Sequence, residues 1–250
     1  MKWLLLCMSF PLFSQSVFQN TISSIYIDNT NISDISSCED GDVLPIIYLN
    51  IPDFSDLTVS EKKAKFVDFI LPAILLEKEK IKKGYNYVLQ HFENTNINDT
   101  IKSLYHYCNC DTSYELLLCL KEQPNSIIIA QAAIESGWGT SRFFLEGNNL
   151  FGIHTYNNDV SKLEANNSSL VYVKKYNTIS ESISHYLRTL AKGYAYENYR
   201  INRLKDTSSI ELIQALMMYS ERRELYVKDL EAIIEYNNLT IYDDFELKYD

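Results

Sequence analysis

The chain has 250 residues, of which 46% are hydrophobic and 22% charged, and its formal net charge is −10. This length and composition predict one globular domain with appendages. The acidic balance argues against nucleic acid as a partner, because phosphate binding depends on Lys and Arg, and no basic patch stands out. Glycine and proline are scarce (7 and 5), and the stretches between them have helical patterns, so a mostly helical fold is expected rather than a sandwich or barrel.

Residues 1–16 have the layout of a secretory signal peptide, with Lys2, an apolar stretch from Trp3 to Phe13, and small polar residues after it. The apolar stretch is shorter than the ~20 residues of a membrane span, so no stable membrane insertion is expected after cleavage. A retained anchor and an N-terminal strand are the alternatives. We therefore expect export to the periplasm or cell envelope, or secretion.

Four cysteines follow the leader: Cys38, Cys108, Cys110 and Cys119. In an exported protein, disulfides between them can persist. Cys108 and Cys110 are too close in sequence to bond each other readily, so each would need Cys38 or Cys119 as its partner. The pairing stays open, with free thiols as the alternative. No histidine cluster accompanies these cysteines, and no metal site is expected.

Residues 17–55 are rich in Ser, Asn, Asp and Ile without a sustained period, which predicts a loosely structured extension. Residues 56–120 are expected to form a helical N-terminal part of the domain, which starts at a capping box of Thr58 and Glu61. Pro72 is expected to kink or divide its first helix. Further helices are predicted around 101–107 and 113–121, from the capping box at 178–181, and from the capping box at 208–211 to residue 219.

A central helix is predicted after Pro124, which suits a first helical turn. Residues 126–134 are apolar nearly all round, so this helix should be buried. Gly137 can supply the left-handed residue that ends it. Glu135 therefore falls in the last turn of a core helix, and Gln131, four residues earlier, shares its face.

A carboxyl held against apolar walls has its charged form disfavoured, so the pKa of Glu135 is expected to be raised. Such a group can donate a proton as the general acid in the cleavage of a glycosidic bond. The alternative is a Glu at a helix end that hydrogen-bonds neighbouring amides.

The stretch PNSIIIAQAAIESGWGTSRFFLEGNNLFGI (124–153) resembles the central motif of the glucosaminidase domains of glycoside hydrolase family 73, in their Bax-like branch. The resemblance continues weakly to about residue 239. It implies a lysozyme-like α+β fold, mostly helical, in which a large helical lobe and a small β lobe flank a groove. Residues 121–250 would be the catalytic core, with the β lobe at 152 to about 176.

The resemblance places the family's catalytic Glu on Glu135, which would protonate the oxygen of the β-1,4 link after N-acetylglucosamine in peptidoglycan. Many members have a second Glu in a T-x-E-Y motif of the β lobe, which this chain lacks. Glu164 is the candidate there, and Asp159 is the other nearby acid. Alternatively, the 2-acetamido oxygen of the substrate attacks the anomeric carbon. Tyr219 would then orient that amide, whereas Tyr226 corresponds to a later, structural Tyr of the family.

The remaining candidates are residues for substrate contact, each with a structural alternative. Trp138 can stack on a sugar ring, although packing between its two glycines is favoured. Asn149, together with Asn148, is expected to hold the turn into the β lobe. The substrate-binding candidates are Gln131, Trp138, Asn149, Phe151, His154, Tyr194 and Tyr199.

The function implied by this resemblance is that of an exported endo-β-N-acetylglucosaminidase that needs no metal or organic cofactor. Its partner would be the glycan strands of peptidoglycan, and a monomer is expected. A lytic transglycosylase, which makes an anhydro sugar by internal attack, is one alternative. A non-catalytic wall-binding scaffold is the other. Whether the reaction is inverting or substrate-assisted stays open.

Overall fold

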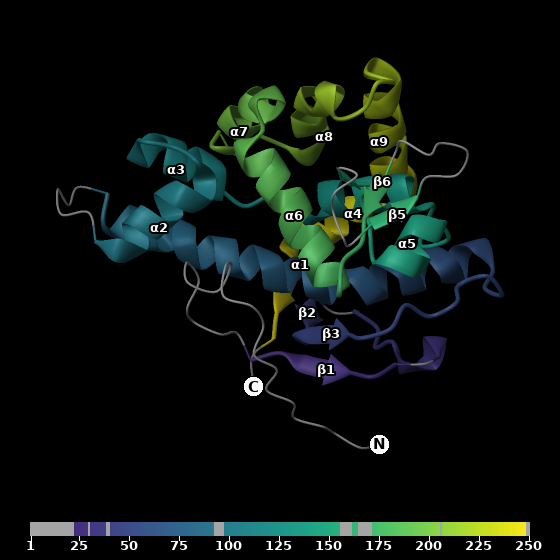
Figure 1. Ribbon diagram of the computed structural model, residues 1–250. Helices are drawn as coiled ribbons and strands as arrows, with labels where there is room; N and C mark the ends of the chain where they lie inside the picture. The colour runs from purple at the N-terminus through teal and green to yellow at the C-terminus, as the bar shows by residue number, and fades with distance from the viewer. Residues whose placement is uncertain are drawn as a thin grey trace.

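The computed structural model describes residues 23–29, 31–38, 41–92, 98–155, 162–164, 172–205 and 207–248. The signal peptide predicted for residues 1–16 lies outside these ranges, and so does Asp159. Within them helices predominate, and the strands are short and form small sheets (Figure 1). No helix in this part of the chain is long and apolar enough to cross a membrane.

Helix α1 (Val59–Gln90) runs across the molecule (Figure 1). It begins at the predicted capping box, in which Thr58 Oγ1 accepts from the Glu61 amide and the Glu61 carboxylate accepts from the Thr58 amide at 3.0 Å. The expected division at Pro72 does not occur, because the helix continues through this residue. Pro72 lacks an amide hydrogen, but the turns around it are buried in the core, and this packing sustains the helix.

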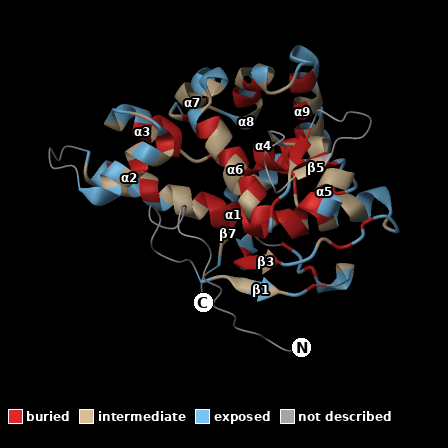
Figure 2. Ribbon diagram, in the orientation of Figure 1, coloured by how far each residue is buried: buried red, intermediate tan, exposed pale blue. Residues whose placement is uncertain are grey.

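Helix α4 (Asn125–Ser136) packs against α1, α9 (Glu224–Tyr236) and the 3-10 helix η4 (Leu239–Asp244). Most of its side chains are buried, as its apolar sequence predicts (Figure 2). Its first turn is capped from η4, because the amide and hydroxyl of Ser126 donate to the Asp243 carboxylate at 2.7 and 2.8 Å. The C-terminal part of the chain therefore holds the start of this central helix.

Helices α2 (Asp99–Cys108) and α3 (Ser113–Leu120) form a hairpin toward one end of α1, at the positions predicted for them (Figure 1). A disulfide joins Cys108 to Cys119 across the hairpin. Cys38 and Cys110 are free thiols, so neither pairing that would involve Cys38 is present. The hairpin covers a second, smaller hydrophobic cluster: Val88, Leu104, Cys108, Leu116, Cys119, Leu120 and Ala191.

The next α-helices after α4 are α5 (Arg142–Gly147), α6 (Ile179–Lys192) and α7 (Glu197–Arg203). Thr178 caps the start of α6 as predicted, because its side-chain oxygen accepts from the Glu181 amide at 3.3 Å. The predicted capping box is only half formed, since the Glu181 carboxylate accepts from the Asn177 amide at 2.9 Å. A short 3-10 helix, η2 (Tyr194–Tyr196), leads into α7.

The single helix predicted to reach Tyr219 is instead a short α8 (Ser209–Leu212) followed by the 3-10 helix η3 (Ile213–Tyr219). A 3-10 helix has three residues per turn, so Ile213, Leu216 and Tyr219 fall in one row. The first two are buried in the main core. Packing of this row thus explains why the tighter helix replaces the expected one, and it directs Tyr219 inward.

The described part of the predicted N-terminal extension packs onto the helical core. Strand β1 (Ile25–Ile27) pairs in parallel with β3 (Ile46–Tyr48), and β2 (Asp42–Val43) pairs with β7 (Glu246–Leu247). The 3-10 helix η1 (Ile32–Asp34) lies between β1 and β2. Tyr48 is buried and stacks on Phe69 of α1 at 5.3 Å between ring centroids. This segment is therefore more ordered than its composition predicts.

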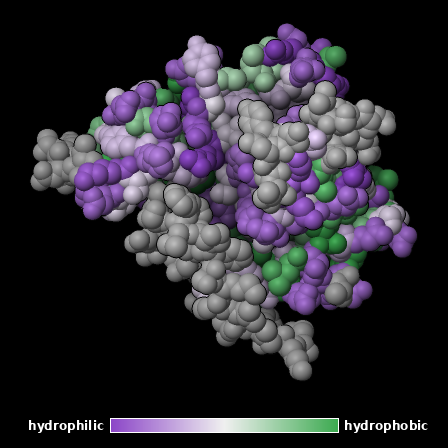
Figure 3. All heavy atoms as spheres, in the orientation of Figure 1, coloured by the Kyte–Doolittle hydropathy of each residue, from purple (hydrophilic) through white to green (hydrophobic). Residues whose placement is uncertain are grey.

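A three-stranded antiparallel sheet occupies the region predicted as the β lobe. Its order is β4 (His154–Thr155), β6 (Tyr172–Lys174) and β5 (Lys162–Glu164), and β5 contacts α5. The predicted fold class, a mostly helical α+β fold with a small sheet, is confirmed. On the face drawn in Figure 3, hydrophilic side chains cover most of the described surface.

Candidate active site

Glu135 lies in the last turn of α4, as predicted. The helix ends because Gly137 adopts a left-handed conformation (φ 60°), and the Trp138 amide donates back to the Ala133 carbonyl at 3.0 Å. The Glu135 side chain is half-buried, and burial raises the pKa of its carboxyl. A hydrogen bond from Tyr226 opposes that rise of the pKa. The carboxyl therefore has the environment expected of a proton donor.

The Gly137-Trp138-Gly139 turn packs against α1. Trp138 has a φ of 57°, and its ring meets Phe66 edge-on at 5.7 Å. The Lys63 ammonium lies 5.0 Å from the Trp138 ring centroid. Gly139 is required for two reasons: its φ is 85°, and an added β-carbon would lie 3.0 Å from the Phe66 ring. Trp138 thus has the packing role that its flanking glycines suggest, and sugar stacking by it stays a prediction.

Two asparagines shape the crossover from α5 into the β lobe. Asn148 is left-handed (φ 51°), and its side-chain amide donates to the Tyr176 carbonyl at 3.0 Å. Asn149 is buried, accepts from the Ile153 amide at 2.9 Å and donates to the Lys174 carbonyl at 2.7 Å. Both hold the turn, as predicted from their side chains.

The crossover brings the backbone of Gly152 to the catalytic candidate. An added β-carbon at Gly152 would lie 3.8 Å from Glu135 Oε2, and the φ of Gly152 is 64°. The end of α4 and the first residues of the β lobe therefore face each other across the Glu135 carboxyl. This is the placement that the family resemblance implied.

A buried hydrogen-bond chain leads to Glu135 from the interior. The Tyr186 hydroxyl donates to Gln131 Oε1 at 2.6 Å, and Gln131 Nε2 donates to the Tyr226 hydroxyl at 3.0 Å. The Tyr226 hydroxyl in turn donates to Glu135 Oε1 at 3.1 Å. The sequence did not predict a site role for Tyr186, whose position in α6 is typical of a core residue. It predicted only a structural role for Tyr226. The one local signal was the spacing of Gln131 and Glu135 on α4.

Tyr219 joins this group of tyrosines. Its ring stacks on Tyr226 at 5.5 Å and 14°, and it meets Tyr186 edge-on at 6.2 Å. Burial raises the pKa of Tyr219 most, and the charges of Tyr226 and Glu135 raise it further. The ring of Tyr196 in η2 lies 6.2 Å from the Tyr219 ring, between centroids. The 3-10 helix thus delivers Tyr219 to the neighbourhood of Glu135, where the resemblance expected it.

The other substrate-contact candidates have separate surroundings. Phe151 is buried and stacks on Tyr186 at 3.9 Å, so it supports the tyrosine group from below the surface. Tyr199 is buried, and its hydroxyl donates to Gln123 Oε1 at 3.1 Å. Tyr194 is 90% exposed, and His154 is exposed at the start of β4. Within the described ranges, no contact links Tyr194, Tyr199 or His154 to Glu135.

Glu164, the candidate second acid, is the last residue of β5, and its backbone pairs with Tyr172 of β6. A catalytic role for Glu164 stays a prediction.

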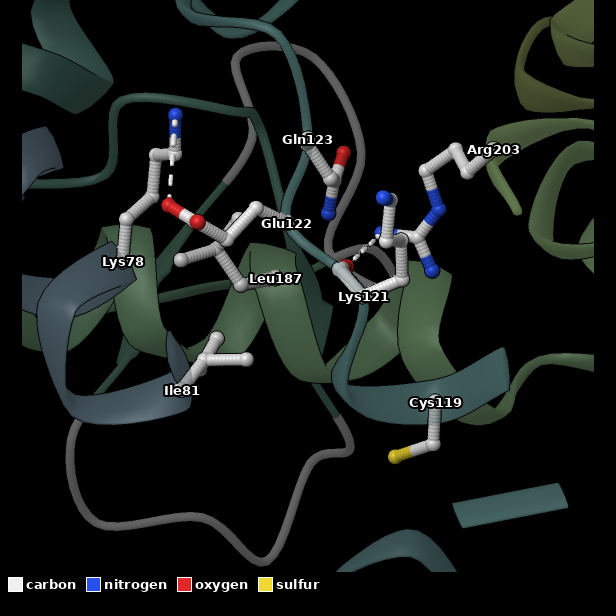
Figure 4. Close-up of a pocket in the computed structure, with 8 residues that line it drawn as sticks. All are labelled: Lys78, Ile81, Cys119, Lys121, Glu122, Gln123, Leu187 and Arg203. Atoms are coloured by element: carbon white, nitrogen blue, oxygen red, sulfur yellow. Dashed lines mark hydrogen bonds and ion pairs between the residues drawn. The ribbon is translucent and has the colours of Figure 1, made fainter. Parts of the chain in front are cut away.

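A small cavity between α1, α3, α6 and α7 is separate from this site (Figure 4). Lys78 Nζ lies 3.9 Å from a Glu122 carboxylate oxygen at one side, and Arg203 donates to the Lys121 carbonyl at 2.7 Å at the other. Burial lowers the pKa of Lys78. Arg203 is buried and links α7 to the end of α3. The charged side chains at this cavity therefore have structural roles. The described residues contain no group of three or more His, Cys, Asp or Glu that could hold a metal.

The family relationship follows from comparison with known proteins. Residues 114–239, about half of the chain, match the glucosaminidase family, described as mannosyl-glycoprotein endo-beta-N-acetylglucosaminidase. The chain belongs to this family. Glu135, the crossover asparagines, the β lobe and the tyrosine group all lie within the matched residues.

Two curated relatives match a similar share of the chain. Protein bax of Escherichia coli is 27% identical over 124 residues, which cover 47% of this chain and 44% of the relative. Exo-glucosaminidase LytG of Bacillus subtilis is 27% identical over 129 residues, with 48% and 46% covered. The chain thus spans less than half the length of the curated relatives it matches. Among solved structures, the catalytic domain of the autolysin Auto from Listeria monocytogenes is 24% identical, covering 62% of this chain and 94% of that domain, with a TM-score of 0.40.

Proposed function

We propose that this chain is a glycoside hydrolase that cleaves peptidoglycan at the β-1,4 bond after N-acetylglucosamine. Membership of the glucosaminidase family supports the reaction class. The observation that carries the proposal is the Glu135 carboxyl, whose burial raises its pKa at the point where the β-lobe crossover approaches it. A carboxylic acid that remains protonated there can act as the general acid.

In the first step, Glu135 gives its proton to the glycosidic oxygen as the bond from that oxygen to the anomeric carbon breaks. The 2-acetamido oxygen of the substrate forms the new bond to that carbon, which gives a cyclic oxazolinium intermediate. Water then attacks the anomeric carbon, opens the ring, and returns a proton to the Glu135 carboxylate. Tyr219 is proposed to orient the acetamido group, since it stacks beside Tyr226 next to Glu135.

A wall-digestion assay with matched Glu→Gln variants tests the general acid. We expect Glu135→Gln to lower activity by at least ~100-fold, the usual scale for a lost general acid. Glu235→Gln is the control, because Glu235 is an exposed glutamate near the end of α9. We expect it to keep full activity. Comparable activity in Glu135→Gln and the wild type would overturn the assignment.

Glu164→Gln in the same assay tests the substrate-assisted route. A small loss relative to Glu135→Gln is expected, because the acetamido group replaces a second carboxylate. Equal losses in the two variants would show instead that the reaction uses two acids.

Mass spectrometry of the digest separates the alternative functions. Internal fragments with a reducing N-acetylglucosamine end are expected for endo cleavage. Release of single terminal sugars would indicate an exo enzyme, the mode named for LytG. An anhydro-muramic end would indicate a lytic transglycosylase. Wild-type protein that binds walls and leaves them intact would indicate a scaffold.

A peptidoglycan substrate also sets the place of action. We propose that the protein works outside the cytoplasm, in the periplasm or cell envelope or after secretion, and that the leader-like residues 1–16 direct its export. It is further proposed to act as a monomer on single glycan strands. Fractionation of cells that express the full chain, with analysis of the N-terminus of the exported protein, tests the place of action. The native mass of the exported protein tests the monomeric state.

A further inference from the structure

The carboxyl of Glu135 is the end of a hydrogen-bond chain whose members come from three helices. Gln131 and Glu135 lie on α4, Tyr186 on α6 and Tyr226 on α9. Gln131 is 0% exposed, and Tyr186 and Tyr226 are 1% and 2% exposed. Such a buried chain is stable only when its donors and acceptors are matched.

The chain has a direction, because each hydroxyl has a single proton to donate. Run toward Glu135, it gives each of the three groups an acceptor: Tyr186 donates to Gln131, Gln131 to Tyr226, and Tyr226 to Glu135 Oε1. Run the other way, it would leave the Tyr186 proton with no acceptor among the described residues. An unpaired buried donor is costly, so the chain runs toward Glu135.

This direction distinguishes the two oxygens of the carboxyl. Because Oε1 accepts a hydrogen bond from the Tyr226 hydroxyl, the acid proton of Glu135 belongs on Oε2. Oε2 is the oxygen that faces Gly152, where an added β-carbon would lie 3.8 Å away. The missing side chain at Gly152 keeps space beside the oxygen that holds the proton.

Ring packing holds the two tyrosines of the chain in place. Phe151 stacks on Tyr186 at 3.9 Å and 10°, and Tyr219 stacks on Tyr226 at 5.5 Å and 14°. With both rings fixed, the hydroxyls stay aligned on Gln131.

We propose that Tyr186, Gln131 and Tyr226 are positioning residues that assign the acid proton of Glu135 to Oε2, the oxygen facing the β lobe. This proposal rests on the proposed function of Glu135 as the general acid. Tyr226 contacts Glu135 directly, whereas Gln131 and Tyr186 act through it.

The chain also tunes the acid. The Tyr226 hydroxyl bonds to the charged form of Glu135 and lowers its pKa, while burial raises it more strongly. The titratable groups on neighbouring elements that respond to the Glu135 charge are Tyr219 on η3 and Tyr226 on α9, and burial raises the pKa of both. They remain neutral while Glu135 titrates. Removal of the Tyr226 hydroxyl is therefore expected to raise the pKa of Glu135.

Carbon-13 NMR of labelled glutamate carboxyls measures this pKa without any need for activity, with Glu135→Gln used to assign the resonance. We expect Tyr226→Phe to raise the pKa of Glu135. Tyr199→Phe is the matched control, because Tyr199 is also buried and donates to a buried glutamine, Gln123. It is expected to leave the pKa unchanged. An unchanged or lowered pKa in Tyr226→Phe overturns the proposal, since a chain running the other way would lose the acceptor of the Glu135 proton.

Tyr186→Phe is a second variant that leaves Tyr226 in place. Without its donor, the Gln131 amide is free to reverse, so we expect a smaller rise in the pKa of Glu135. No rise in this variant would remove Tyr186 from the proposed chain.

Activity over a range of pH then separates this inference from the proposed function. In Tyr226→Phe, kcat/KM is expected to fall about 10-fold, as for one lost hydrogen bond to a charged group. Its basic limb should move to higher pH together with the pKa of Glu135. If the NMR titration moves while the basic limb stays, the chain is upheld and Glu135 is not the general acid.

Discussion

At the scale of single residues, the site depends on one carboxyl with two different oxygens. Glu135 Oε1 is held from the interior by Tyr226, and Oε2 faces the crossover at Gly152. Burial raises the pKa of this carboxyl, which favours proton donation but disfavours its ionised form in the folded protein. A residue suited to catalysis is therefore a residue that costs stability once it ionises.

That cost predicts how stability changes with pH. The folded-state pKa of Glu135 is raised above its ordinary value of 4.5, so the folded protein holds this proton more tightly than the unfolded chain. Stability should then fall as pH rises from about the ordinary pKa through the raised one. Glu135→Gln cannot ionise and escapes this loss. Its free energy of unfolding should therefore rise relative to that of the wild type over that pH range.

Urea unfolding of both proteins at a series of pH values measures this difference. Glu235→Gln, on the exposed end of α9, controls for the substitution itself. If the free energy of unfolding of Glu135→Gln did not rise relative to that of the wild type as pH rises, the raised pKa would be contradicted.

At the scale of elements, the end of α4 is defined by a tight turn against α1. Gly139 has a φ of 85° and lies where a β-carbon would be 3.0 Å from Phe66 and 3.2 Å from Phe54. The left-handed backbone and the lack of space both exclude a side chain. The turn therefore fixes where the last residues of α4, including Glu135, stand relative to the core.

Two glycine variants separate backbone strain from crowding. Gly41 has a φ of 84° with no atom within 4 Å of an added β-carbon, so Gly41→Ala should cost only the backbone term, about 1 kcal/mol. Gly139→Ala adds overpacking against the two Phe rings and should cost about 3 kcal/mol in total. Guanidinium unfolding gives both values. Equal losses would mean that the rings move aside without cost.

At the scale of the whole molecule, two hydrophobic clusters of the described residues stabilise different parts of the fold. The main cluster surrounds α4 and the site, whereas the smaller one lies under the α2 and α3 hairpin that the Cys108–Cys119 disulfide closes. The site draws none of its described contacts from the hairpin. The hairpin is therefore expected to open without disturbing Glu135.

Removal of the disulfide tests this division. The Cys108→Ala/Cys119→Ala double variant should lose about 3 kcal/mol of stability, the scale for a loop with a sequence separation of 11 residues. In hydrogen exchange, the amides of α2 and α3 should lose protection first, while those of α4 keep theirs. Equal loss of protection in α4 would show that the molecule unfolds as a single unit.

Local rules were sufficient for much of the site. The apolar sequence before Glu135 and the left-handed Gly137 predicted a buried helix that ends beside it. The family resemblance implied the crossover, and the side chains of Asn148 and Asn149 predicted how its turn is held. The hydrogen-bond chain was beyond such rules, because Gln131 meets partners 55 and 95 residues away in sequence.

Tertiary packing also decided the elements that were predicted wrongly. Helix α1 continues through Pro72 because its middle turns are buried, and η3 winds more tightly because one row of its side chains enters the core. The strands near the N-terminus are two or three residues long, too short for an alternating pattern to reveal them. Each of these strands can be recognised only when the strand that pairs with it is known.

The capping of α4 from η4 affects the order in which a newly made chain can complete its site. Ser126 is held by Asp243, 117 residues later, and the Asn125 side chain donates to the Tyr242 carbonyl at 2.6 Å. A polypeptide emerging from the ribosome with its N-terminus first contains Glu135 long before it contains these anchors. The helix that bears the acid gains this support only after η4 has emerged, so synthesis itself delays completion of the site.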